Sequence, residues 1–126
     1  MKQKFKAVSK VNPLKPKDAP KYYPAPVYTG TYSLDDLSQY ISNISTVSEI
    51  DVAAVLRAFV KVFPEILQKG NRIDLEGIGM FSLGFETSSS DKIEDVSAHN
   101  VTRVKLKFAA EHKLKKAIEN TLVEKA

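Results

Sequence analysis

Nine basic residues have a type and spacing that could bind a row of anions. Six lie near the C-terminal end of the chain and three near its start. They are Arg103, Lys105, Lys107, Lys113, Lys115, Lys116, Lys4, Lys6 and Lys10. Clustered arginine and lysine create the positive potential that attracts phosphate groups. The sequence therefore predicts contact with a polyanion.

Side chains for catalysis or for metal binding are few. The chain has no cysteine, and His99 and His112 are its only histidines. Neither histidine has a partner at metal-ligand spacing or in a nucleophile–base pair. The carboxylates Asp35 and Asp36 suit a helix start better than an acid–base pair. We therefore expect no enzyme activity, no cofactor, no metal and no small-molecule substrate.

The composition is typical of an ordinary globular protein. The 126 residues are 43% apolar and 27% charged, which fits one domain plus a tail. No stretch approaches the roughly 18 apolar residues of a membrane span, and the first residues lack the apolar core of a signal peptide. We expect a cytoplasmic protein that does not enter a membrane.

The net charge of +4 hides a strong segregation along the chain. Residues 1–30 hold seven lysines and one acid, whereas residues 31–100 hold five basic and eleven acidic side chains. Residues 101–126 hold seven basic and three acidic side chains. Basic ends around an acidic middle favour a polyanion at the ends, although charged tails that only increase solubility would give the same pattern.

Five of the six prolines lie in residues 12–26. Proline fixes φ and removes a hydrogen-bond donor, so this segment should be extended and without helix. We expect an arm that follows a short strand at residues 4–11. Its tyrosines could stack on bases, but pinning the arm onto its own domain is the preferred interpretation. The chain thus divides into a basic, proline-rich extension, residues 1–30, and a folded part, residues 31–126.

Two helices are predicted at the start of the folded part. Ser33 is a suitable N-cap for an amphipathic helix over residues 33–43. A wide apolar stripe over residues 52–67 predicts a second helix, which Gly70 closes. Pro64 lies inside it and should kink or split the helix, since proline cannot donate to the carbonyl four residues earlier.

After Gly70 the apolar period changes from helical to two. The alternation predicts two strands near residues 72–76 and 81–85, and Gly77 and Gly79 can supply the positive φ of a tight connection. Gly84, in the second strand, indicates a bend or a close approach.

Three more segments complete the chain. Residues 86–100 are polar and predict a loop or a short, weakly formed arm. Residues 101–108 predict a third strand, with Arg103, Lys105 and Lys107 on one face and apolar side chains on the other. A last helix is expected over residues 110–121.

These elements carry motifs of a known family. The helix pair ends in Lys69-Gly70, and residues 77–81 look like the family's Gly-Phe-Gly-x-Phe turn. Phe108 with Leu114-Lys115 and Ala117-Ile118 looks like its Phe-Lys-Pro-Gly-Lys-x-Leu-Lys-x-Ala-Val segment. Over residues 31–120 the chain resembles the bacterial HU and integration host factor family of histone-like DNA-binding proteins. The Lys-Tyr-Tyr-Pro arm resembles a divergent HU-like subset with such an extension.

The resemblance implies an α+β, HU/IHF-like fold. It would contain two N-terminal helices, a three-stranded antiparallel sheet with a shortened arm, a C-terminal helix and an intertwined homodimer. The apolar surface supports the dimer independently of the resemblance. The 52–67 stripe together with Phe81, Phe85 and Phe108 is a large apolar surface for a domain of about 90 residues, and a second copy could bury it. A compact monomer is the alternative.

The departures from the family bear on function. The segment between Phe81 and Phe108 has no proline, no arginine before Arg103, and three acids, Asp91, Glu94 and Asp95. A strong intercalating kink in DNA is therefore not expected. The family's Pro-Gly-Lys before the last helix is replaced by Ala-Glu-His, which puts a phosphate contact there in doubt.

The leading hypothesis is a nucleoid-associated protein that binds double-stranded DNA of varied sequence. Lys115 matches a family lysine, and the nine basic residues would contact phosphates rather than bases. The competing hypothesis is a dimer of the same fold that acts as a protein-interaction scaffold without strong DNA binding. RNA binding is a weaker third option, because no RNP-type aromatic motif supports it.

Overall fold

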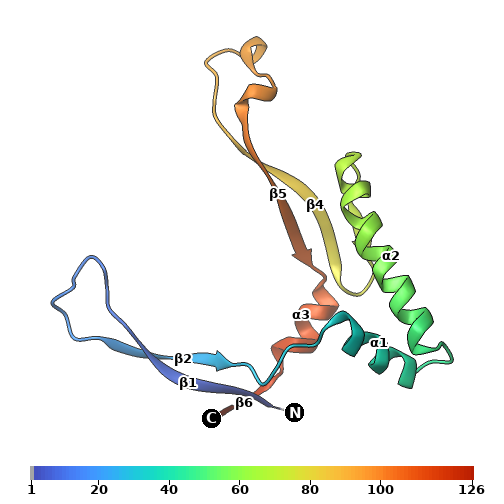
Figure 1. Ribbon diagram of the computed structural model, residues 1–126. Helices are drawn as coiled ribbons and strands as arrows, with labels where there is room; N and C mark the ends of the chain where they lie inside the picture. Colours follow the sequence, from blue (N-terminus) through green and yellow to red (C-terminus); the bar gives the residue numbers. More distant parts are fainter. Residues whose placement is uncertain (1) are drawn as a thin grey trace.

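The computed structural model describes residues 2–126 as an extended α+β molecule. Three α-helices accompany two three-stranded sheets, and two long hairpins project in different directions from the centre (Figure 1). One hairpin is formed by β1 and β2 and the other by β4 and β5. The α+β class and the three helices were predicted from the sequence, but the second sheet was not.

The N-terminal sheet joins the two ends of the chain. Strand β1 (Lys2–Lys10) pairs antiparallel with β2 (Lys21–Val27) and parallel with β6 (Leu122–Lys125), in the order β2-β1-β6. The prediction of a strand near residues 4–11 is confirmed in outline. Of the extended arm expected over residues 12–26, the part from residue 21 onward is the edge strand β2, where Pro24 and Pro26 are tolerated because an edge strand does not need every backbone donor.

The tyrosines of this segment do not pin it onto the rest of the domain, so that interpretation is wrong. Tyr22 is 72% exposed and Tyr28 is 80% exposed. Tyr23 receives the ammonium of Lys10 over its ring, 5.5 Å from the centroid. Pairing with β1, rather than aromatic packing, holds the segment in place.

Helices α1 (Leu34–Asn43) and α2 (Glu49–Gln68) form an antiparallel pair. Ser33 caps α1 as predicted: its Oγ accepts from the Asp36 N–H at 3.1 Å, and Asp36 Oδ2 accepts from the Ser33 N–H at 2.9 Å. Arg57 of α2 donates to Asp35 Oδ1 of α1 at 2.8 Å. Helix α2 continues through Pro64 without interruption, so the expected split does not occur.

The second sheet is three-stranded and antiparallel, as predicted. It consists of β3 (Ile73–Leu75), β4 (Gly79–Thr87) and β5 (Val101–Ala110), in the order β3-β4-β5. Gly77 and Gly79 have φ of 86° and 156°, which confirms their role in the β3–β4 turn. We call the β4–β5 hairpin the arm. Its end contains two single turns of 3₁₀ helix, Ile93–Asp95 and Ala98–Asn100, where the sequence predicted a loop or a weak arm.

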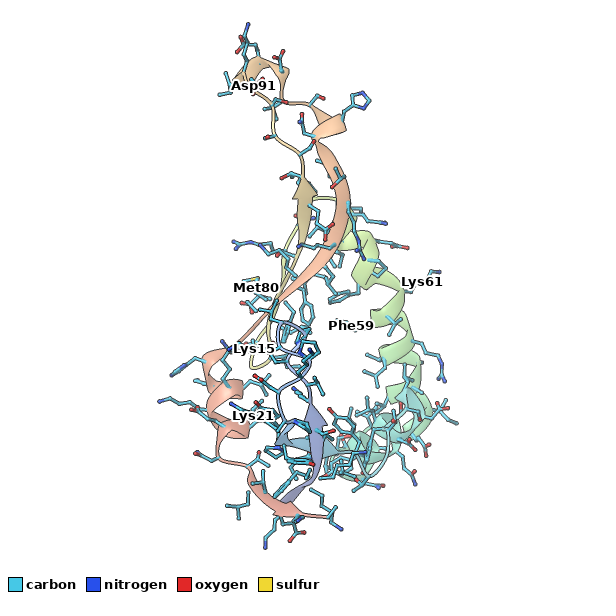
Figure 2. The ribbon with its side chains drawn as sticks, turned by 90° about the vertical axis from the view of Figure 1, so that its left-hand side faces the viewer. Lys15, Lys21, Phe59, Lys61, Met80 and Asp91 are labelled. Atoms are coloured by element: carbon cyan, nitrogen blue, oxygen red, sulfur yellow. The ribbon has the colours of Figure 1, made fainter. Side chains whose placement is uncertain are left out.

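Packing is concentrated where α2 meets the base of the arm. The rings of Phe59, Phe63, Phe81 and Phe108 follow one another with centroid separations of 5.4, 5.0 and 4.6 Å. Phe59 points from α2 toward the arm, whereas Lys61 points away from it (Figure 2). Among residues 2–126 only two hydrophobic side chains, Val52 and Leu67, are buried. One chain alone therefore has very little core.

Helix α3 (His112–Glu119) ends two residues before the predicted limit of 121. Thr121 closes its last turn by donating through its N–H to the Ile118 carbonyl at 3.1 Å. The chain then enters β6. The sequence did not predict this strand, because four residues gain their pairing only from β1 at the other end of the chain.

Candidate nucleic-acid interface

The arm has two chemically different faces. Cross-strand pairs Phe81–Phe108, Leu83–Leu106 and Phe85–Val104 alternate with pairs that contain the predicted cations. We call the six side chains of these three pairs the apolar strip. On the opposite side, Arg103, Lys105 and Lys107 form the basic face of the arm, as the alternation predicted.

The three cations of the basic face have different neighbours on β4. Arg103 lies opposite Glu86, whereas Lys105 lies opposite Gly84 and Lys107 opposite Ser82. The stem of Lys107 also passes across Gly84: a Cβ atom there would stand 2.8 Å from Lys107 Cγ. The opposing carboxylate weakens the field of Arg103, so Lys105 and Lys107 carry most of the positive potential of this face.

Helix α3 follows directly after β5 and adds three lysines. Lys113 and Lys116 are three residues apart and share one side of the helix. Leu114 and Ile118 form an apolar stripe, and Lys115 lies on the other side of this stripe. All three lysines are exposed, and Leu114 is half-buried. The six C-terminal cations thus form a continuous basic segment over β5 and α3.

Glu111 fixes the start of α3 against the β3–β4 turn. Its carboxylate Oε2 accepts from the Gly77 N–H at 2.5 Å, and its own N–H donates to the Ile78 carbonyl at 2.9 Å. This position belongs to the segment that departs from the HU motif. The Glu111 carboxylate thus links α3 to the β3–β4 turn, at the position where family members would have a group that contacts phosphate.

The three N-terminal cations lie on the other sheet. Lys4, Lys6 and Lys10 share one face of β1, and the structure adds to that face two residues that were not among the nine predicted cations. Register places Tyr23 opposite Val8 and Lys21 opposite Lys10. Only the pairing of β1 with β2 reveals these neighbours, since they are distant in sequence.

All nine predicted cations are exposed and available to a ligand. Within residues 2–126 the salt bridges are Lys2–Glu124 at 3.7 Å and Arg57–Asp35 at 2.8 Å, and neither uses one of the nine. The structure divides the nine into six on β5 and α3 and three on the N-terminal hairpin (Figure 1).

The end of the arm is ordered and acidic. The Asn100 amide donates to the Ser88 carbonyl at 3.1 Å and to Ser90 Oγ at 2.9 Å. Asp91 lies at the far end, distant from Lys15 and Lys21 of the other hairpin (Figure 2). Carboxylates at this end make it a poor surface for phosphate.

A family model described as an HU domain fused to a wHTH, Ig or glycine-rich motif matches residues 1–125. The chain belongs to the HU-HIG family. The match includes the N-terminal hairpin as well as the HU-like part. Membership in HU-HIG thus confirms the expected HU-like relationship, and the fold agrees with it.

A solved structure has the same fold as this HU-HIG chain. It is the 2.25 Å crystal structure of a protein from Bacteroides vulgatus ATCC 8482, named as a candidate bacterial DNA-binding protein, with a TM-score of 0.65 and 14% sequence identity. The alignment covers 98% of this chain and 47% of that protein, so the chain spans about half of its length. No curated protein matches significantly.

Within residues 2–126, no group of three or more His, Cys, Asp or Glu side chains is placed to hold a metal ion. Over the same residues, no helix has the length and apolar character needed to cross a membrane.

Proposed function

We propose that this HU-HIG protein binds double-stranded DNA of varied sequence as a nucleoid-associated protein. The basic face of the arm and the lysines of α3 contact phosphates, and Lys4, Lys6 and Lys10 add to the binding. Family membership and the fold shared with a protein named as a DNA-binding candidate support this proposal.

One observation carries the proposal. Six cations on consecutive elements, β5 and α3, are exposed, and no carboxylate neutralises them in a salt bridge within residues 2–126. Solvent-exposed cations in a row release condensed counterions when they meet phosphates, and this term depends on charge rather than base sequence. Lysine at most of these positions also favours point-charge contacts over the bidentate reading of guanine by arginine.

A salt series tests this function. Fluorescence anisotropy with duplexes of unrelated sequence should give similar affinities. The slope of log K against log salt should be about −5 if six phosphates are contacted by one chain. Absence of binding to any duplex at low salt would contradict the proposal.

We also propose that the functional unit is a homodimer. The described chain exposes 10997 Å². A compact monomer of 14.0 kDa would expose about 6,700 Å². Part of the difference is the apolar strip, where Phe85 is 59% exposed and Leu106 is 57% exposed. A second copy that covers the strip would supply the missing core.

Solution mass tests the dimer. Light scattering should give about twice 14.0 kDa for the wild type. Leu106→Glu places a charge in the apolar strip and should dissociate the dimer. Lys105→Glu changes the neighbouring residue on the basic face and should leave the mass unchanged. A monomeric wild type at micromolar concentration would overturn the proposal.

The acidic end of the arm favours a second candidate function, a protein-interaction scaffold. Asp91, Glu94 and Asp95 lie there beside exposed Ile93 and Val96, a surface suited to protein rather than phosphate. Charge reversal at Arg103, Lys105 and Lys107 separates the two functions. DNA binding requires a loss of affinity, whereas a scaffold would keep a protein partner bound elsewhere.

We further propose that residues 1–30 and residues 31–126 are two functional parts of the chain. The first part supplies β1 and β2, and the second supplies the HU-like elements, although β6 connects them by pairing with β1. Limited proteolysis between Tyr28 and Ser33 should release the first part only slowly, because β6 retains it. Rapid release would show that the pairing is weak.

A further inference from the structure

The N-terminal sheet is amphipathic, with a lysine face and an apolar face. Along β1, Lys2, Lys4, Lys6 and Lys10 occupy alternate positions with Val8. Strand β2 adds Lys21 and Tyr23 to this side. We define the lysine face as Lys2, Lys4, Lys6, Lys10, Lys21 and Tyr23.

The opposite face of the sheet is apolar, and its residues alternate with the lysines along β1. Phe5 and Ala7 of β1 lie beside Pro26 and Pro24 of β2, and with Val123 of β6 they line one open groove. Strand alternation thus sends all lysines of β1 to the other side of the sheet. This face has few acids. The exceptions are Glu124 beside Lys2 and Asp18, which lines one pocket together with Lys10, Lys21 and Tyr23.

The remaining lysines of this face are free. Lys4, Lys6 and Lys21 have no salt-bridge partner within residues 2–126, and the Lys10 ammonium is held over the ring of Tyr23 rather than by a carboxylate. A two-stranded β-ribbon such as the β1–β2 hairpin can enter the major groove of DNA or follow its backbone.

The lysine face is separated from the basic segment on β5 and α3. The β1–β2 hairpin leaves the centre in a direction different from that of the arm, and both views of the molecule agree on this (Figures 1 and 2). Strand β1 alone extends the hairpin by about 30 Å over its nine residues. DNA is stiff over such distances, since its persistence length is about 150 base pairs.

We propose that the lysine face binds a second segment of double-stranded DNA, so that the protein bridges two duplexes. One segment lies on β5 and α3 and the other lies along the N-terminal hairpin. A single duplex would have to bend sharply to follow both directions, and the arm has no proline at its end to wedge the bases apart. The inference rests on the proposed DNA binding through β5 and α3.

Bridging and simple binding can be measured separately on the full chain. Beads that carry one duplex should retain a fluorescent second duplex only when the protein is present. Anisotropy with the fluorescent duplex alone reports simple binding. The test variant is Lys4→Gln/Lys6→Gln/Lys10→Gln. The matched control, Lys61→Gln/Lys69→Gln/Lys92→Gln, removes the same charge from outside the lysine face.

The test variant should bind a single duplex up to about threefold more weakly than the wild type, because it loses the contribution of Lys4, Lys6 and Lys10 while β5 and α3 are intact. Its retention of the second duplex should fall by about tenfold, since bivalent attachment is lost. The control should keep both activities. Because all substituted side chains are exposed, these changes should leave the circular dichroism spectrum unaltered.

Three results would overturn the inference. Bridging that survives in the test variant would show that the hairpin is not the second site. A proportional loss of simple binding and bridging would place the hairpin on the same duplex as the arm. Binding without bridging in the wild type would exclude the second segment while leaving the proposed function intact; no binding at all would overturn the proposed function itself.

Discussion

Gly79 lies against the ring of Phe108: a Cβ atom on Gly79 would stand 2.7 Å from Phe108 Cε1 and closer still to the Ala109 carbonyl oxygen. The obstacle is therefore partly backbone, and the φ of 156° is unfavourable for other residues. We predict that Gly79→Ala lowers the free energy of unfolding by more than about 1 kcal/mol. Thermal denaturation followed by circular dichroism would measure it, and an unchanged midpoint would contradict this account.

Gly84 gives the opposite expectation, although it belongs to the same strand. A Cβ there would meet only the stem of Lys107, which can move. Gly84→Ala should therefore change the free energy of unfolding by less than about 0.5 kcal/mol. Its effect should appear in DNA binding, as a small decrease in the salt slope when the Lys107 ammonium is displaced. Equal destabilisation by Gly79→Ala and Gly84→Ala would refute the distinction.

The three cations of the arm should contribute unequally to DNA binding. Lys105 and Lys107 lie opposite uncharged residues, and Arg103 lies opposite Glu86. Lys105→Gln and Lys107→Gln should each reduce the magnitude of the salt slope by about 0.9. Arg103→Gln should reduce it less, and Glu86→Gln should increase affinity. Anisotropy at several salt concentrations would check this order, with Lys61→Gln as the control.

Acid should weaken the start of α1. Hydrogen bonds from the Ser33 backbone N–H, and then from its hydroxyl, hold the pKa of Asp36 below its usual value. A lowered folded-state pKa stabilises the fold above the unfolded pKa of about 3.9, and this contribution is lost as the pH falls through the folded pKa. Asp36→Asn should therefore show a smaller decrease in melting temperature between pH 5 and pH 3 than the wild type.

The control for this pH series is Asp91→Asn, at the exposed end of the arm. This variant should follow the wild-type profile, because no structural element depends on that carboxylate. The same profile for Asp36→Asn and the wild type would show that the capping carboxylate does not contribute.

Glu111→Ala should change stability and DNA binding in opposite directions. Removing the acceptor of the Gly77 N–H should lower the free energy of unfolding by about 1 kcal/mol. Removing a negative charge beside Lys113 and Lys115 should increase DNA affinity. Glu119→Ala, at the other end of α3, should increase affinity without the loss of stability. Denaturant unfolding and anisotropy on both variants would test this, and a weaker DNA complex for Glu111→Ala would contradict it.

Local signals in the sequence predicted the HU-like part of the fold. The Ser33 cap, the stripe along α2 and the glycines of the β3–β4 turn each act over a few residues, so their positions are visible without the structure. Alternation along β5 likewise predicted which face holds the cations. Pro64 is the exception: α2 continues through it, although proline removes a hydrogen bond from the interior of a helix.

The N-terminal sheet depends on pairing that no local pattern indicates. The prolines of residues 12–26 predicted an extended arm but no strand pairing, yet pairing with β1 makes residues 21–27 the edge strand β2. The four residues of β6 gain their structure from Lys2–Phe5 at the other end of the chain. Lys21 and Tyr23 therefore join the lysine face only through the register of the hairpin, and this part of the candidate site could not be found from spacing.

The pairing of β1 with β6 also determines when the N-terminal sheet can finish folding. Lys2 pairs with Leu122, so nearly the whole chain separates the two strands, and closing so long a loop is entropically costly. During synthesis β1 and β2 emerge before the other elements described here, but β6, the third strand of their sheet, emerges after them all. Until then one edge of β1 has unpaired backbone groups, which can recruit a strand from another molecule. The nascent protein is thus most prone to mispairing between the emergence of β1 and the translation of β6.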